Sequence, residues 1–233
     1  MIHRPLFVGV FISFFTTFNI FAQKDFAIWS GLEYKVIISK KLSLGGAIQF
    51  RSENNNSQLA ERFASPYIKY RAFKNLSLGV DYRFSNNWRN GVAVEDRHRV
   101  TIDLNVEKLL KSLPFKTRFA LSSRIRYVNE SRTGDLNNQH LRGRIKLSYN
   151  VRKTKIEPYI ASELFYHFND QLYYTNSNVL AINRFNKLRL KFGISLPFTK
   201  KHLLRVFYML QKKTQGPGSI FVTGLNYRFR WKV

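Results

Sequence analysis

The sequence predicts an all-β fold: an antiparallel, up-and-down transmembrane β-barrel of about 10–12 strands. Three observations support this prediction. Apolar and charged residues alternate with a period of two along most of the chain. Several alternating stretches reach the ~9–11 residues that a transmembrane strand needs, whereas strands of soluble proteins average about 5–6 residues. Short and long connections follow one another between these stretches, as they do in outer-membrane barrels.

The first 22 residues stand apart from this pattern. Arg4 supplies a positive charge, residues 6–21 are apolar or small, and Ala22 precedes Gln23. A charged start, an apolar core and a small residue at the cleavage point are typical of a secretory signal peptide. The alternative is a single membrane anchor, which needs ~20 apolar residues. We therefore expect a cleaved signal peptide at 1–22 and one barrel domain at 23–233.

The composition narrows the function. The chain of 233 residues has a net charge of +25 and no cysteine, so no disulfide stabilises it after export. A cytoplasmic domain this basic would suggest a nucleic-acid partner. Export argues against nucleic acid and leaves acidic sugars, lipid phosphates and small anions as partners.

Residues 116–127, KTRFALSSRIRY, illustrate the alternation. The charged side chains fall on even positions: Lys116, Arg118, Arg124 and Arg126. The large apolar side chains fall on odd positions: Phe119, Leu121, Ile125 and Tyr127. A helix would scatter both sets around its circumference, whereas a strand separates them onto two faces.

The same pattern predicts eleven strands, at 26–37, 42–51, 63–73, 76–84, 97–106, 116–127, 141–149, 156–168, 187–196, 203–211 and 221–231. Residues 107–112 form a short connection. Bacterial single-chain barrels have even strand numbers, so eleven would mean that one strand is missed, wrongly divided or wrongly included. Twelve strands are preferred. Short turns are expected at 39–41, 74–75, 150–154 and 197–201. Longer loops are expected at 52–58, 85–95, 129–139, 169–181 and 212–219.

Alternation alone does not show which face of the sheet contacts water. A soluble barrel turns its apolar residues inward, whereas a membrane barrel turns them toward lipid. Strand length, loop alternation and aromatic residues near both strand ends favour the membrane arrangement. The expected location is the outer membrane of a Gram-negative bacterium. A soluble periplasmic β-protein is the alternative.

Short motifs extend over nearly the whole exported chain: Trp29 with Glu33, YR at 70–71 and 82–83, RHR at 97–99, RIRY at 124–127, RGR at 142–144, SELFYHF at 162–168, NRF at 183–185 and NYRF at 226–229. With these motifs the chain resembles the uncharacterised outer-membrane β-barrels catalogued as domain of unknown function 2490. The resemblance implies fold and location but no activity. One departure is the final Val233, since many such barrels end in an aromatic residue.

With the apolar face outward, the basic residues of the other face line the interior. The expected basic cluster comprises Lys69, Arg71, Arg83, Arg97, Arg99, Lys116, Arg118, Arg124, Arg126, Arg142, Arg144, Lys146, Arg189 and Lys191. Its expected acidic partners are Glu33, Asp81, Asp103 and Glu163. Three interpretations remain: a rigid Arg–Glu network, a narrow anion-preferring pore, or basic rims that contact lipopolysaccharide and lipid phosphates.

No catalytic, cofactor or metal site is expected. The histidines are scattered without metal-ligand spacing, and Ser162 and His167 fall on opposite faces of one strand. An outer-membrane enzyme that modifies lipids is the remaining alternative function. The oligomeric state is left open.

Overall fold

The computed structural model describes residues 25–89, 92–107, 109–112, 118–132, 135–168, 174–175, 178–179, 184–214 and 219–233. The expected signal peptide, 1–22, lies outside the described residues. The strands are β1 (Asp25–Ile37), β2 (Leu42–Glu53), β3 (Gln58–Arg71), β4 (Leu76–Arg89), β5 (Val92–Val106), β6 (Phe119–Arg132), β7 (Asp135–Tyr149), β8 (Glu157–His167), β9 (Tyr174–Thr175), β10 (Asn178–Val179), β11 (Phe185–Pro197), β12 (His202–Lys213) and β13 (Ser219–Lys232). One short 3-10 helix, η1 (Leu109–Ser112), lies in the connection expected at 107–112.

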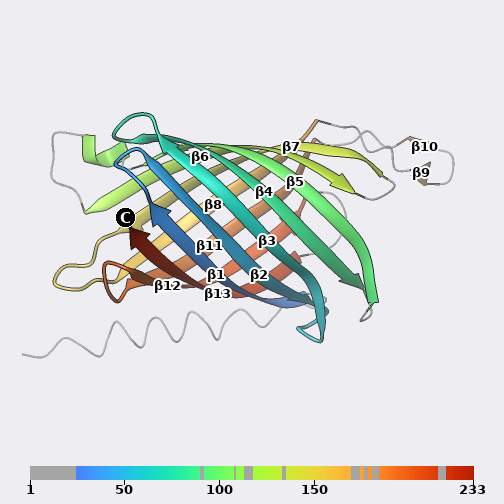
Figure 1. The fold of residues 1–233 in the computed structure, drawn as a ribbon. Coiled ribbons are helices and arrows are strands. Elements are labelled where there is room, and N and C mark those ends of the chain that lie inside the picture. Colours follow the sequence, from blue (N-terminus) through green and yellow to red (C-terminus); the bar gives the residue numbers. More distant parts are fainter. Residues whose placement is uncertain are drawn as a thin grey trace, which may run out of the picture.

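The long strands close into a single barrel, in the order β1-β13-β12-β11-β8-β7-β6-β5-β4-β3-β2. Figure 1 shows these strands wrapped around one axis with a steep tilt. The short strands β9 and β10 pair with each other outside the barrel. Within the described residues, no helix is long and apolar enough to cross a membrane.

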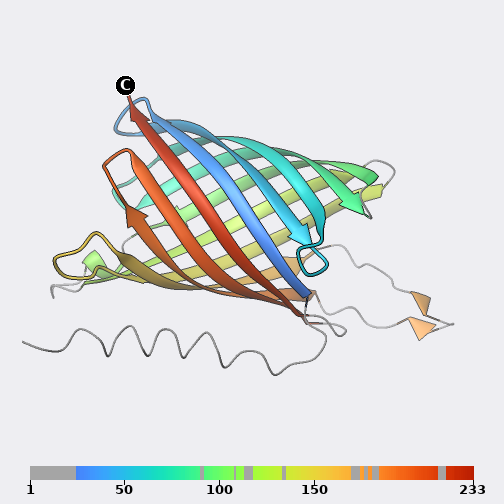
Figure 2. The same ribbon diagram turned by 90° about the horizontal axis from the view of Figure 1, so that it is seen from below.

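The barrel has 11 strands, so the preferred count of twelve is wrong. The expectation of a purely antiparallel barrel is also wrong, because β1 and β13 pair in parallel. Their register runs from Asp25 opposite Ile220 to Ile37 opposite Lys232. The two strands lie side by side in Figure 2, β1 in blue and β13 in red. A closed barrel with an odd strand number needs one such parallel pair, because up-and-down strands otherwise alternate in direction.

The two ends of the barrel differ. At the turn end lie the connections that follow β1, β3, β5, β7 and β11, together with the last residues of β13. At the loop end lie the first residue of β1 and the connections that follow β2, β4, β6, β8 and β12. Residues 25 and 233 therefore stand at opposite ends of the barrel.

Several expected loops are wrong in extent, because the strands continue through them. β4 and β5 include most of 85–95, and β6 and β7 include most of 129–139. These strand ends carry polar residues on both faces, so composition alone makes them look like loops. Within the expected 52–58 loop the chain turns at Asn54, Asn55 and Asn56, whose positive φ angles asparagine tolerates.

The large apolar side chains lie on the outer surface. Leu32, Ile145 and Ile68 are more than half exposed, while the buried hydrophobic set is small. Part of that set forms one interior cluster, in which Ala27, Phe207, Met209 and Val222 pack beside the β1–β13 junction. The Phe207 ring lies directly over Gly224, where a methyl group would clash with it.

Candidate functional site: the interior charge network

The interior of the barrel carries charged side chains from most strands. Many of them form ion pairs with the residue directly opposite on the neighbouring strand. Arg126 donates two hydrogen bonds to Asp103, each 2.5 Å long. Arg51 pairs with Glu61 at 2.5 Å, and Arg99 pairs with Glu130. Opposed ion pairs of this kind stabilise neighbouring strands and hold the interior side chains in place.

Glu163, the acid expected in the interior of β8, connects three strands. It accepts a hydrogen bond from Arg124 of β6 at 2.8 Å and one from Arg189 of β11 at 3.4 Å. Its side chain is 13% exposed. Since β7 lies between β6 and β8, the contact with Arg124 passes over the interior surface of β7.

The other expected acids also lie among polar partners. Glu33 pairs with Arg228 at 2.7 Å and accepts a hydrogen bond from the Tyr67 hydroxyl at 3.0 Å. Asp81 accepts a hydrogen bond from Ser65 rather than from an arginine. Each of these contacts is an interior contact between neighbouring or near strands.

The expected basic cluster divides into three groups. Seven members make ion pairs in or beside the interior: Lys69, Arg97, Arg99, Arg124, Arg126, Lys146 and Arg189. Arg71 and Arg118 are instead exposed at the turn end. Lys116 lies outside the described residues.

A third group consists of interior cations that make no ion pair within the described part of the chain: Arg83, Arg142, Arg144 and Lys191. Each of the three arginines lies opposite another arginine: Arg83 opposite Arg99, Arg142 opposite Arg126, and Arg144 opposite Arg124. Like charges placed opposite each other on neighbouring strands are destabilising. Among the described residues, these four cations therefore have no carboxylate within ion-pair distance.

Several of these cations lie over the faces of aromatic rings inside the barrel. The Arg83 guanidinium lies 3.6 Å from the centre of the Phe63 ring. Arg142 lies 4.6 Å from the Phe165 ring, and Lys191 lies 4.0 Å from the Phe207 ring. A cation over an aromatic face gains about 0.5–2 kcal/mol. This attraction offsets part of the repulsion without removing the charge.

Sequence reasoning did not find these interior aromatics or three of the interior acids. Trp29, Phe63 and Phe165 stand an even number of residues from the charged residues of their strands. This spacing places their side chains on the interior face and is the signal that could have found them. Glu61, Glu95 and Glu130 fall in or next to stretches interpreted as loops. Extending the alternation of β6 past Arg126 to Val128 and Glu130 would have found the last of these.

Two of the described histidines contact each other in the interior. His140 is buried and stacks on His167, with ring centroids 4.9 Å apart, and it accepts a hydrogen bond from Arg142. His98 lies on the outer face beside Tyr82. Within the described residues, no group of three or more His, Cys, Asp and Glu side chains is arranged to hold a metal ion.

The geometry defines a class: a closed β-barrel with an apolar outer face and a charged, partly aromatic interior. The family model described as "Protein of unknown function (DUF2490)" matches residues 26–221, and the chain belongs to this family. The resemblance predicted from the sequence is confirmed.

Two further comparisons are less informative. No curated protein matches the chain. Among solved structures, the chain is similar to an anion-selective porin from Comamonas acidovorans, with 12% sequence identity and a TM-score of 0.39. That match covers 81% of this chain and 53% of the porin, so the chain spans about half of the porin's length.

Proposed function

We propose that this protein is a β-barrel of the outer membrane of a Gram-negative bacterium, exported by a signal peptide at 1–22. The strand lengths support this location. β1 has 13 residues, which rise about 43 Å along the strand. At a tilt of ~45° such a strand crosses about 30 Å, the thickness of the hydrocarbon core.

The outer surface gives the second support. Leu32 is 62% exposed and Ile145 is 60% exposed, and similar side chains surround the barrel. A soluble protein rarely exposes a continuous apolar surface of this extent, because contact between apolar side chains and water is unfavourable. Lipid acyl chains would remove this cost. The arrangement therefore favours the membrane barrel over a soluble periplasmic β-protein.

Detergent extraction tests the location. We expect the protein to remain in the membrane fraction after a high-salt wash and to dissolve in detergent. The folded barrel should migrate faster on a gel before heating than after heating. Release into aqueous buffer, with migration unchanged by heating, would contradict the membrane location.

For the function, we propose that the interior forms a narrow path that prefers small anions. The supporting observation is the set of opposed arginines on β4–β5 and β6–β7, of which Arg142 and Arg144 make no ion pair within the described residues. A pore lined by a ring of arginine side chains attracts anions and repels cations. The excess charge has a local energetic cost, which a purely structural interior could avoid with uncharged residues.

Planar-bilayer conductance tests the path. In a KCl gradient we expect a small conductance whose reversal potential indicates a preference for chloride. The double variant Arg142→Gln/Arg144→Gln should lower this preference severalfold and should fold at least as stably as the original, because it removes like-charge repulsion. The control Lys40→Gln/Lys41→Gln changes two exposed residues of a turn. At about 1 M salt the Debye length is ~3 Å, so the control should not change selectivity.

Three outcomes would contradict the proposal. Absence of current from a correctly folded barrel would indicate that the interior charge network only stabilises the structure. Cation selectivity, or an unchanged chloride preference in Arg142→Gln/Arg144→Gln, would show that these arginines do not select ions.

We propose no catalytic activity for the barrel. Ser162 and His167 stand an odd number of residues apart on β8, so they project from opposite faces. This arrangement does not support a serine–histidine pair. Mass spectrometry of lipid A and phospholipids, with and without the protein, checks the point, and a protein-dependent change in either lipid would contradict it.

A further inference from the structure

An apolar groove lies on the wall formed by β6, β7, β8, β11, β12 and β13. Its volume is about 460 Å³. Large apolar side chains line it, including Phe119, Tyr149, Ile160, Phe192 and Val206. Most of the lining residues belong to the outer face, and Phe192 is 48% exposed there. The groove is therefore a hollow in the surface that the proposed function assigns to lipid.

The groove follows the hydrogen-bonded rows across the strands. One row passes through side chains that lie directly opposite one another on consecutive strands: Leu147, Ile160, Phe192, Tyr208 and Thr223. Strands are spaced about 4.8 Å apart, so this row of five extends for about 19 Å. A row of this length, with an apolar lining, could accommodate a single extended hydrocarbon chain.

The row is also inclined in the way an acyl chain requires. Leu147 lies two residues from the end of β7 at the turn end, whereas Thr223 is the fifth of the 14 residues of β13, counted from the loop end. The row therefore starts near the turn end and rises past the middle of the wall. With strands tilted by ~45°, a row of about 19 Å spans about 13 Å along the membrane normal. This is close to the thickness of one leaflet of a hydrocarbon core that is ~30 Å thick.

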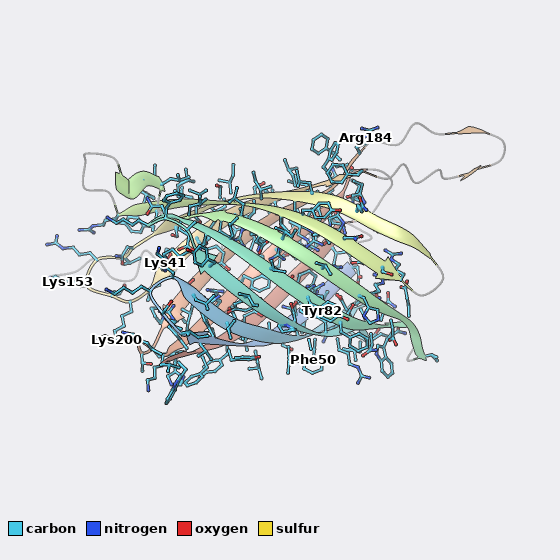
Figure 3. The ribbon with its side chains drawn as sticks, turned by 45° about the horizontal axis from the view of Figure 1, so that its top comes forward. Lys41, Phe50, Tyr82, Lys153, Arg184 and Lys200 are labelled. Carbon is cyan, nitrogen blue, oxygen red and sulfur yellow. The ribbon has the colours of Figure 1, made fainter. Side chains whose placement is uncertain are left out.

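Exposed cations lie at the turn end of the barrel, close in sequence to residues that line the groove. Arg118 directly precedes Phe119, and its carbonyl accepts a hydrogen bond from Asn150 at 3.0 Å. The following turn, 150–156, contains Arg152, Lys153 and Lys155, all exposed, and no acid. Lys153 and Lys200 both project at the turn end in Figure 3, and Lys155 donates a hydrogen bond to the Phe198 carbonyl at 3.3 Å. The nearest acid in the sequence, Glu157, lies 4.0 Å from Lys146.

We propose that this groove binds an anionic phospholipid of the leaflet at the turn end. One acyl chain lies along the row from Leu147 to Thr223, and the phosphate lies beside Arg118, Arg152, Lys153 and Lys155. The acyl chain alone would not select a headgroup, whereas the cations select a negative one. This inference rests on the proposed membrane location but not on the anion path.

Native mass spectrometry of the detergent-solubilised barrel tests the headgroup site. Phosphatidylglycerol is the anionic probe and phosphatidylcholine the zwitterionic probe. We expect one phosphatidylglycerol to be retained more strongly than phosphatidylcholine. The triple variant Arg152→Gln/Lys153→Gln/Lys155→Gln should weaken retention at least tenfold, because each basic residue near an anionic lipid contributes roughly fivefold to binding. The matched control, Lys40→Gln/Lys41→Gln/Lys74→Gln, removes three exposed turn cations of the opposite wall and should retain the lipid.

A second pair of variants tests the groove itself. Val206→Trp fills the hollow, whereas Val80→Trp adds the same ring on the opposite wall, where Val80 is 52% exposed. Only the first should reduce lipid retention, by severalfold. Heat-modifiable migration of every variant checks that the barrel has folded.

Four outcomes would overturn the proposal. Equal loss in both triple variants would mean general attraction between a basic protein and anionic lipid. Equal retention of the two phospholipids, or no effect of Val206→Trp, would exclude a specific site. A dimer that survives without lipid and dissociates in Val206→Trp would identify the groove as an interface between two copies. Failure of the membrane location itself would appear separately, as release of the protein into aqueous buffer.

Discussion

Trp29 of β1 lies directly beside Gly224 of β13, and the two strands run in the same direction. This pair closes the barrel. The missing side chain of Gly224 makes room for the Phe207 ring, which packs with Trp29 in the interior cluster next to the junction. An antiparallel closure would bring a different set of β13 residues beside β1, so the parallel register is open to a direct test.

Paired cysteines distinguish the two closures, since the chain has no cysteine of its own. The parallel register places Ile28 opposite Thr223 and Leu32 opposite Tyr227. Cysteines at either pair should form a disulfide, because opposed residues on neighbouring strands are within the ~4.4–6.8 Å that a disulfide spans. Gel electrophoresis without reductant measures the cross-link.

The crossed combinations of these positions are the control. Cysteines at 28 with 227, or at 32 with 223, would be opposite in an antiparallel closure with the same centre. In the parallel register they stand four residues out of alignment, about 13 Å apart. Cross-links in the crossed pairs, and not in the direct pairs, would refute the parallel closure.

Removing Glu163 should strongly destabilise the barrel. The variant Glu163→Gln leaves Arg124 and Arg189 without their shared carboxylate, and breaking a buried ion pair from one side costs about 3–5 kcal/mol. Unfolding by urea in detergent, followed by the gel shift, measures the loss. Glu157→Gln is the control, because Glu157 is 42% exposed and lies 4.0 Å from Lys146, and it should cost less than about 1 kcal/mol. Similar losses in the two variants would show that Glu163 has no special role.

The contact between Gly224 and Phe207 predicts a difference between two glycines. Gly224→Ala places a methyl group in the Phe207 ring and should destabilise the barrel by about 1–3 kcal/mol. Phe207→Ala in the same chain should make the alanine at 224 harmless. Nothing lies within 4 Å of a methyl group at Gly143, so Gly143→Ala should be neutral or slightly stabilising. The same unfolding assay checks all three variants, and equal effects of the two single changes would contradict the packing.

The ion pair between Lys69 and Glu107 predicts a modest pH dependence at the turn end. Glu107 follows the last residue of β5 and lies 2.9 Å from Lys69. Burial alone would raise the pKa of the Glu107 carboxyl, but the hydrogen bond and charge of Lys69, with Lys35 and Arg71, lower the pKa below its ordinary value. A carboxyl with a lowered pKa stabilises the folded state above its unfolded pKa of about 4.3 and loses this effect as the pH falls through the folded value.

The variant Glu107→Gln should therefore melt at a slightly lower temperature than the original protein at pH 7. The difference should disappear as the pH is lowered through the folded pKa, which lies below the unfolded value, because the carboxyl then binds a proton in the folded and the unfolded protein alike. Because the Glu107 side chain is 49% exposed, the effect should stay below about 1 kcal/mol. A difference that grows on acidification would contradict the ion pair.

The sequence predicts the strands and their two faces well, because both depend on a local period of two. The extent of the strands is harder to predict. Around Glu130 and Arg132 the chain is polar on both faces, and only the pairing with β5 and β7 keeps it extended. The parallel closure could not be predicted, since the pairing of the first and last strands leaves no local pattern.

The interior shows the same division. The parity of β8 places Glu163 inside, but it does not say which arginine reaches it. Arg144 and Arg189 are both directly opposite Glu163, yet only Arg189 makes an ion pair with it. The second ion pair is made by Arg124, two strands away. That choice depends on how long side chains cross the interior. Trp29 and Phe165 also lie inside, on the same side of their strands as Glu33 and Glu163, so charge alone does not identify every interior side chain.

The odd strand number has a consequence for reporters fused to the barrel. Asp25 and Val233 lie at opposite ends, separated by the full height of the wall. In an intact cell, a protease or antibody confined to the medium would reach an epitope inserted before Asp25 or one placed after Val233, but not both. An even-stranded barrel in the proposed outer membrane would display both epitopes in one compartment, so the two tags reveal whether the strand number is odd or even without a structure.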